Sequence, residues 1–329
     1  MKMQNNVRDE CKVNIENGLL LYHHPYSYYS QKVLMALHEK EIPFEEYIIN
    51  LVKNEQYEQW FLDLNPRGEF PVLDASGLII PSSSKILTYL EDHYQHDESI
   101  NQLIPTDHGN KIHQKVTYFR YQLDQIQSGI ITLGSFFHEE YVGRPKIPFI
   151  KPVRTAMKNA ENNRVEFLTE QMEYNPRYRH VFQQKINNSK RRHEIITSKN
   201  EFLQQLDLVD SVLDKVEDEL ASHPKTTDEE SWLCCEAFTA ADISLTVLLE
   251  RLNVLGLENH FWGDGKRPHV EEFYKKVQSR SSYKKTMPNV KIHLRLITQG
   301  HKRCTIAASV LTSSLFVVGG FLLVRKLLR

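Results

Sequence analysis

The sequence predicts an α/β domain, then an all-α domain, and then one membrane-spanning helix at the C-terminus. Over roughly the first ninety residues, short apolar runs alternate with apolar residues at helical spacing, and from residue 107 the spacing is mainly helical. Near the end, residues 305–324 include no charged side chain. We expect four segments: a flexible N-terminus at 1–17, a first domain at 18–97, a second domain at 107–299 and the membrane helix at 305–324.

The overall composition argues against nucleic acid as a partner and against a disulfide framework. The 329 residues include 41 basic and 42 acidic side chains, so the chain as a whole carries almost no net charge. The cysteines show neither paired disulfide spacing nor repeated zinc-ligand spacing; they are Cys11, Cys234, Cys235 and Cys304. We therefore expect a reducing compartment and no metal site.

The first domain is expected to open as strand, helix, strand, helix. The apolar run Gly18 to Tyr22 is typical of a buried strand, and Val33 to Leu37 follow with helical spacing. A second strand is expected from Phe44 to Leu51. The helix over residues 57–64 should end before Pro66, because a residue that precedes proline disfavours the helical conformation.

A hairpin and a closing helix complete the first domain. Residues 70–74 and 78–80 are short strands, and Ala75-Ser76-Gly77 between them forms the hairpin turn. Ile86, Leu87 and Leu90 then have the spacing of a helix. The resulting order, a βαβ unit followed by a hairpin and a helix, is thioredoxin-like.

Several residues of this domain match one known pattern: Leu21-Tyr22, Ser27, Ser30, Lys32-Val33, Asn65-Pro66, Phe70-Pro71-Val72-Leu73, Ile86 and Tyr89-Leu90. The pattern resembles the N-terminal domain of glutathione transferases. The resemblance implies that Pro71 is cis and that Phe70 presents its backbone to an extended peptide such as glutathione. It also implies ligand-binding roles for Ser82, Ser83 and Lys53.

Ser27 has two interpretations that the sequence leaves open. The resemblance places it where related transferases keep a serine that donates a hydrogen bond to the glutathione thiolate and so activates the nucleophile. Ser27 also precedes a helix, where serine ordinarily serves as the N-cap. The first interpretation makes Ser27 catalytic, and the second makes it structural.

The pair Ser82-Ser83 departs from the family pattern, which has an acidic residue or glutamine before the serine. Ser83 and the free N–H groups at the helix start suit the γ-glutamyl carboxylate of glutathione, since a helix N-terminus favours anions. The partner of the glutathione ammonium group is missing, and a charge-assisted hydrogen bond contributes about 1.5–3 kcal/mol. We therefore expect weak glutathione binding or none, and a protein that is not an efficient enzyme.

The second domain should begin with one long helix from Asp107 to Tyr141. Residues 142–200 then contain thirteen Lys or Arg against five Asp or Glu and few aliphatic residues. We expect this basic insertion to form an exposed, partly helical arm. Three roles stay open: a solvated extension without function, a docking site for fission or tethering proteins, and a contact with anionic headgroups.

A helix start is the clearest local signal in the second domain. Thr239 and Asp242, three residues apart, form a capping box, and Phe238 with Ile243 fits the hydrophobic staple. This structural pattern resembles the capping motif of the transferase helical domain. The neighbouring Cys234-Cys235 is more typical of buried small side chains than of a redox or metal site.

Two further motifs are Trp232-Leu233-Cys234 and Trp262 to Pro268. They belong to one pattern with the capping segment, the basic insertion and the terminal apolar run. Together they resemble the ganglioside-induced differentiation-associated protein 1 family. The resemblance implies a tail-anchored protein of the mitochondrial outer membrane that promotes fission of the network, and some members also act on peroxisomes. Gly263, Gly265 and Pro268 indicate a tight turn, so this motif's own role is expected to be structural.

Residues 305–324 are expected to anchor the chain in a lipid bilayer. Twenty helical residues span about 30 Å, the thickness of the hydrocarbon core. Basic residues close both ends of the run. Because only five residues follow, insertion must take place after translation, and the main body stays in the cytosol.

Three functions are weighed on this basis. The first is an adaptor or sensor on the mitochondrial surface that promotes fission, built on a scaffold able to form a homodimer. The second is a membrane-tethered glutathione transferase that acts on hydrophobic electrophiles, with Ser27 as the thiolate donor. The third is a subunit of an outer-membrane import complex. Thiol-transfer activity that depends on Ser27 distinguishes the second from the first.

Overall fold

The computed structural model describes residues 18–94, 101–105, 110–223 and 231–289, together with residues 292 and 296. The expected N-terminal segment 1–17 and the expected membrane helix 305–324 lie outside these residues. Across the described ranges, no helix combines the length and the apolar character that crossing a membrane requires. The chain divides into two compact units, Met1–Asn101 and Gln102–Arg329.

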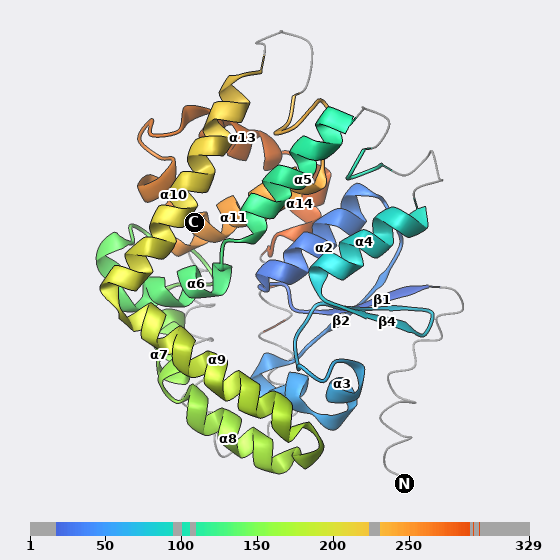
Figure 1. Ribbon diagram of the computed structural model, residues 1–329, viewed down its shortest axis with the longest axis vertical. Coiled ribbons are helices and arrows are strands. Elements are labelled where there is room, and N and C mark those ends of the chain that lie inside the picture. Colours follow the sequence, from blue (N-terminus) through green and yellow to red (C-terminus); the bar gives the residue numbers. More distant parts are fainter. Residues whose placement is uncertain are drawn as a thin grey trace, which may run out of the picture. The chain divides into compact units, whose positions relative to one another are not determined.

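The first unit has the thioredoxin-like order that the sequence predicts (Figure 1). A four-stranded sheet with the order β2-β1-β3-β4 has β1 and β2 parallel and the other pairs antiparallel. Its elements are β1 (Leu19–His23), α2 (Tyr28–Glu39), β2 (Glu45–Ile48), η1 (Leu51–Lys53), η2 (Glu55–Tyr57), α3 (Gln59–Leu64), β3 (Val72–Ala75), β4 (Leu78–Pro81) and α4 (Ser83–Tyr94).

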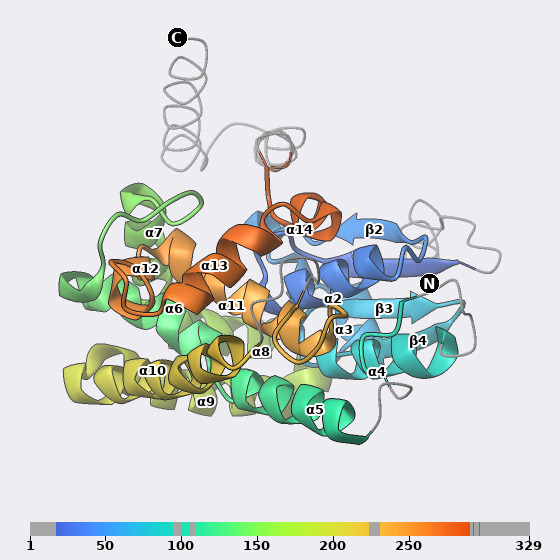
Figure 2. The same ribbon diagram turned by 90° about the horizontal axis from the view of Figure 1, so that it is seen from above.

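Helices cover both faces of this sheet, with α2 and α4 side by side on one face and α3 on the other (Figures 1 and 2). Successive strand residues point to opposite faces. Leu21 and Leu73 pair across β1 and β3, are fully buried and face α2 and α4. Val72 points the other way and packs with Phe61 of α3 and with Ile49.

The second unit is entirely helical in its described part, as the sequence predicts. Its helix α11 (Ala240–Leu255) is buried on almost every side and contacts α5, α6, α12 and α13, which makes it the centre of the unit. The other elements are α5 (Asn110–Asp124), α6 (Ser128–Phe137), η3 (Glu139–Tyr141), α7 (Lys151–Asn162), α8 (Arg164–Tyr174), η4 (Pro176–Tyr178), α9 (Arg179–Thr197), α10 (Lys199–Ala221), α12 (Glu258–Phe261), α13 (Pro268–Val277) and α14 (Ser281–Thr286).

The single long helix expected from Asp107 to Tyr141 was wrong. The structure has two helices there, α5 and α6, with a break at residues 125–127. Serine and glycine follow the break, at Ser128 and Gly129, and both are weak helix formers. Ile126 lies outside both helices but is buried, so the apolar spacing in the sequence continues through the break and gives no sign of it.

The expectation of an exposed arm at 142–200 was also wrong. Helices α7, α8 and α9 are part of the packed unit, and α9 contacts α6, α8 and α10. Phe182, Ile186 and Ile196 of α9 are at most 5% exposed. These few apolar residues lie on one helical face, and the many charged residues between them made the whole stretch read as solvated.

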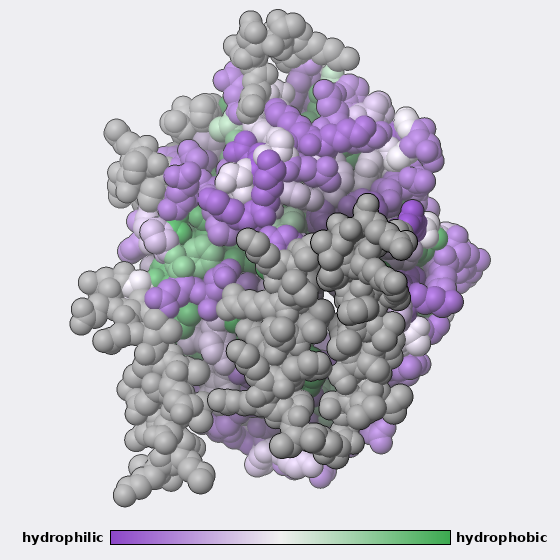
Figure 3. Space-filling model, turned by 180° about the vertical axis from the view of Figure 1, so that it is seen from behind, coloured by the Kyte–Doolittle hydropathy of each residue, from purple (hydrophilic) through white to green (hydrophobic). Residues whose placement is uncertain are grey.

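An ion pair holds the insertion's own helices together. The guanidinium of Arg192 in α9 donates hydrogen bonds to both carboxylate oxygens of Glu161 in α7, at 2.7–3.0 Å. Glu161 is buried, so the paired guanidinium offsets the cost of keeping a carboxylate away from water. On the side drawn in Figure 3, hydrophilic side chains dominate the surface around a smaller hydrophobic area.

The capping box forms at the start of α11. Asp242 Oδ2 accepts hydrogen bonds from the Thr239 N–H (2.8 Å) and from the Thr239 hydroxyl (2.7 Å), and Oδ1 accepts one from the Leu233 N–H (2.8 Å). Burial raises the pKa of Asp242 to about 6. Phe238 and Ile243 on either side are both buried.

Candidate functional site

One edge of the sheet in the first unit gathers most of the predicted ligand-binding residues. Tyr22, near the end of β1, pairs with Val72 at the start of β3, and Val72 pairs with Pro81 at the end of β4. The loop after β1, the peptide before β3 and the start of α4 therefore meet at this edge. Ligands of open α/β sheets commonly bind outside such strand ends.

The Phe70–Pro71 peptide bond at this edge is cis, as the resemblance implied. Pro71 is buried, and its carbonyl accepts a hydrogen bond from the Ser82 N–H at 3.3 Å. Among the described residues, the backbone N–H and C=O of Phe70 form no hydrogen bond. Both groups can therefore pair with an extended peptide that lies along the edge.

Ser27 is the N-cap of α2, which fits the structural interpretation. Its Oγ accepts a hydrogen bond from the Ser30 N–H at 3.3 Å. A hydroxyl that accepts through its oxygen still has its hydrogen to donate. The capping role is therefore compatible with donation to a ligand thiolate, and the geometry does not force a choice between the two interpretations.

Ser82 and Ser83 place the N-terminus of α4 at the same edge. Ser82 has a φ of 83°, in the left-handed region that non-glycine residues rarely adopt, and its carbonyl accepts from the Ile86 N–H at 3.0 Å. Ser83 is the first helical residue and is buried. The first-turn N–H groups of α4 can receive an anion, whereas Ser82 brings no carboxylate for a cation.

The structure does not bring Lys53 into contact with these residues. It ends η1, which follows the parallel strand β2, and its side chain is exposed. Its backbone N–H donates to Asn50 Oδ1 at 3.2 Å. No hydrogen bond or ion pair joins its ammonium group to another predicted site residue within the described structure.

His24, which sequence reasoning missed, is a half-buried titratable group at this edge. Its imidazole lies 6.3 Å from the ring of Phe70 and 5.7 Å from that of Tyr26, measured between centroids. Burial lowers the pKa of His24 to about 4, so the ring is neutral at physiological pH. The available signal was a histidine between the end of a strand and the N-cap of a helix.

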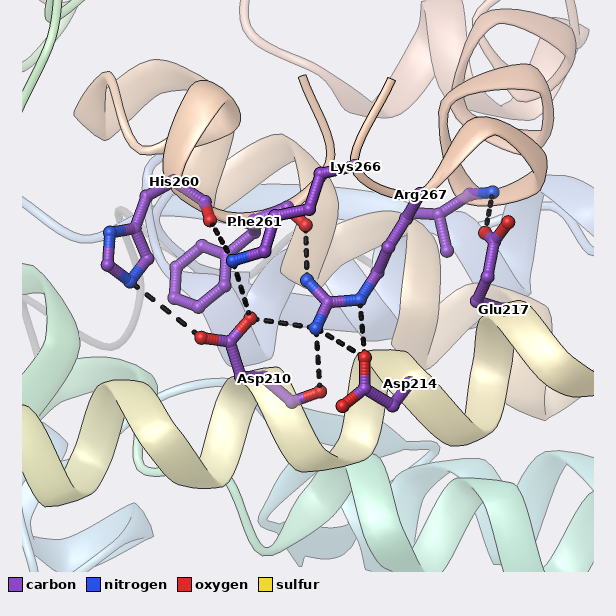
Figure 4. Close-up of polar contacts among 8 residues, drawn as sticks. Asp210, Asp214, Glu217, His260, Phe261, Lys266 and Arg267 are labelled. Carbon is purple, nitrogen blue, oxygen red and sulfur yellow. Dashed lines mark hydrogen bonds and ion pairs between the residues drawn. The ribbon is translucent and has the colours of Figure 1, made fainter. Parts of the chain in front are cut away.

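The Trp262 to Pro268 motif of the second unit has a structural role (Figure 4). Arg267 is 4% exposed, and its guanidinium binds Asp214 Oδ1 (2.5 and 3.0 Å) and the Asp210 carboxylate (2.8 Å) on α10, together with the Phe261 carbonyl. Gly265 turns the chain with a φ of 77°. The motif thus ties the turn before α13 to α10.

Cys234 of the second unit is a buried free thiol. Burial raises the pKa of the Cys234 thiol well above its usual range, so the thiolate needed for redox or metal chemistry is disfavoured. No cluster of three or more His, Cys, Asp or Glu residues suitable for a metal occurs among the residues described in either unit.

Two family profiles match the chain. The profile "Glutathione S-transferase, N-terminal domain" matches residues 21–98, and "Glutathione S-transferase, C-terminal domain" matches residues 175–276. The chain is similar to "Ganglioside-induced differentiation-associated protein 1-like 1" of Homo sapiens, with 31% identity that covers 85% of this chain and 76% of the relative. The Mus musculus protein of the same name is 30% identical, with 86% and 77% covered.

Solved structures show the same fold at lower identity. Glutathione transferase F7 from Populus trichocarpa has a TM-score of 0.55 and 20% identity, with 82% of this chain and 97% of that chain covered. The beta-etherase LigF from Sphingobium sp. strain SYK-6 has a TM-score of 0.56 and 19% identity, with 82% and 98% covered. At this identity the likeness supports the fold alone.

Proposed function

Because the chain belongs to the ganglioside-induced differentiation-associated protein 1 family of glutathione S-transferase-like proteins, we propose that it is a tail-anchored protein of the mitochondrial outer membrane that promotes fission. It acts there as an adaptor or sensor rather than as an efficient enzyme. Its pocket in the first unit binds glutathione weakly, and its main body faces the cytosol. A second location on peroxisomes is part of the same proposal.

The observation that carries the sensor function is the incomplete ligand site. The cis peptide bond at Pro71 and the N-termini of α2 and α4 provide contacts for a peptide backbone and a carboxylate. Ser82 stands where a carboxylate or amide would hold the ammonium group of glutathione. A pocket that keeps part of its contacts favours reversible, weak occupancy over efficient turnover.

The membrane location is supported by the sequence of residues 305–324, which are uncharged over the length of a bilayer core. Basic residues on both sides suit contact with headgroups. A tether of this kind leaves both folded units on the same side of the membrane, where adaptor function requires them.

The partner surface is proposed to lie on the exposed side of α9. Lys190 and Arg191 are both exposed there, whereas Phe182 and Ile186 of the same helix are buried. Fission or tethering proteins with an acidic surface are complementary to this side. A homodimer is also proposed, by analogy with glutathione S-transferase-like relatives.

A membrane-tethered glutathione transferase is the second candidate, and one observation favours it. The hydroxyl hydrogen of Ser27 remains available to a thiolate although the oxygen caps α2. Thiol-transfer assays with hydrophobic electrophiles decide between the two. Turnover that disappears in Ser27→Ala supports the transferase, and absence of turnover in the wild-type chain supports the sensor.

Imaging of cells that lack the endogenous protein tests the leading proposal. The cells receive the full chain, a version that ends at Gln299, or the double variant Lys190→Glu with Arg191→Glu. We expect the shortened chain to leave mitochondria and the double variant to stay there without promoting fission. Lys284→Glu with Lys285→Glu, an equally exposed pair on α14, is the matched control for charge. A shortened chain that remains on mitochondria contradicts the tail anchor.

A further inference from the structure

His24 lies in the loop that joins β1 to α2, and contacts from two sides fix its place in the candidate site. Its Nδ1 accepts a hydrogen bond from the Tyr26 N–H at 3.3 Å, and its carbonyl accepts one from the Ser27 N–H at 2.9 Å. Its ring lies beside Phe70, the residue before the cis bond. The imidazole therefore stands between the N-cap of α2 and the peptide-binding edge.

The hydrogen bond at Nδ1 determines which ring nitrogen carries the proton. A neutral imidazole has one N–H, and Nδ1 is used as an acceptor, so the proton is on Nε2. Within the described residues, the Nε2–H group of His24 has no protein acceptor. The His24 side chain is only partly buried, so its ring is not closed off from a ligand.

We infer that His24 is a second hydrogen-bond donor to the thiol sulfur of a glutathione-like ligand, acting through Nε2–H beside the Ser27 hydroxyl. This inference rests on the proposed glutathione pocket. In the step concerned, the thiol releases its proton to water, and the sulfur lone pairs then accept hydrogen bonds from Nε2–H and Oγ–H. No other bond forms or breaks.

The acid–base properties of His24 make it a donor rather than a general base. A thiol has an ordinary pKa of about 8.5, so transfer of its proton to an imidazole with a pKa of about 4 is unfavourable by a factor of about 30,000. A neutral N–H needs no protonation to stabilise a thiolate. A hydrogen bond to a charged group corresponds to roughly a tenfold or larger change in the ionisation equilibrium.

Titration of bound glutathione tests the inference on the full chain in detergent. The thiolate is followed by its ultraviolet absorbance across pH for the wild type, His24→Phe, His24→Gln and Ser27→Ala. Affinity is measured by calorimetry for glutathione and for S-methylglutathione, which has no ionisable thiol. His38→Phe is the matched control, since His38 is a histidine beside a phenylalanine at the other end of α2.

We expect His24→Phe to lower the ionised fraction of bound glutathione roughly tenfold at a fixed pH below the thiol pKa, and His24→Gln to restore much of it. Binding of S-methylglutathione should not change in either variant. An unchanged thiolate titration in His24→Phe overturns the role of His24 but not the glutathione site. If His24→Phe weakens binding of S-methylglutathione as much as binding of glutathione, the role of His24 is structural and the inference is also overturned. A wild-type chain that is folded yet binds neither probe overturns the pocket as well.

Discussion

Replacing Asp242 by alanine tests how much the start of α11 contributes to the second unit. The change removes the acceptor for two backbone N–H groups, those of Leu233 and Thr239, and both residues are fully buried. A buried donor left without a partner costs about 1–3 kcal/mol. The two together therefore cost about 2–6 kcal/mol.

An opposing effect reduces this cost. Burial raises the pKa of Asp242, which means that the folded state bears a penalty for its charge at neutral pH, and alanine removes that penalty. We therefore expect a net loss in the free energy of unfolding of about 1–3 kcal/mol. For a unit of this size the unfolding temperature should fall by roughly 2–12 °C.

Thermal unfolding of the full chain in detergent, followed by circular dichroism, measures the effect. Thr239→Ala removes the cap hydroxyl but leaves the carboxylate to accept both backbone groups, so it should cost only about 1 kcal/mol. Asp218→Ala, an exposed aspartate on α10, should stay within about 0.5 kcal/mol of the wild type. The reasoning is refuted if Thr239→Ala is at least as destabilising as Asp242→Ala, or if Asp242→Ala matches Asp218→Ala.

Four further outcomes are expected. The raised pKa of Asp242 contributes stability that is complete below the ordinary aspartate pKa of 3.8 and is lost as pH rises through about 6. The wild type should therefore lose stability relative to Asp242→Asn over that range and then level off, and a constant difference contradicts this. Arg267→Ala should lower the free energy of unfolding by about 1–3 kcal/mol in denaturant melts, because it removes the buried guanidinium that joins the Phe261 carbonyl to Asp210 and Asp214, whereas exposed Lys275→Ala should be near neutral. Gly134→Ala should cost about 1–3 kcal/mol, because the added Cβ would lie 2.3 Å from the Phe202 ring, while Gly129→Ala, in open space, should not; equal melts for both would contradict the packing argument. Phe182→Ala on α9 should cost about 3–5 kcal/mol if the insertion is part of the packed unit, and an unchanged melting temperature would indicate a separate arm.

The sequence predicted the first unit well because its signals are local. The alternation of apolar runs with helical spacing gave the order of strands and helices, and only the bounds changed, as in the second strand, which is Glu45–Ile48 rather than Phe44 to Leu51. Tyr57, expected in the second helix, lies in η2 instead. Such shifts are ordinary where short turns precede a helix.

The insertion and His24 were missed because their positions depend on distant residues. Along α9, the four buried apolar residues Val181, Phe182, Ile186 and Ile196 stand among many polar ones, and only contact with α6 and α10 shows that they pack into the unit. His24 packs beside Phe70, which lies far away in the sequence. No pattern within one segment records a contact of this kind.

The packing of α9 against α6 and α10 also predicts how inherited substitutions in this stretch would act. A change at Ile186 or Ile196 weakens the whole helical unit, so cells would degrade more of the protein and keep a smaller amount of it. If α9 carries the partner surface proposed above, a change at Lys190 or Arg191 leaves the amount unaltered and modifies only what the protein recognises. Neighbouring positions in one helix would therefore give two distinguishable defects, one of quantity and one of quality.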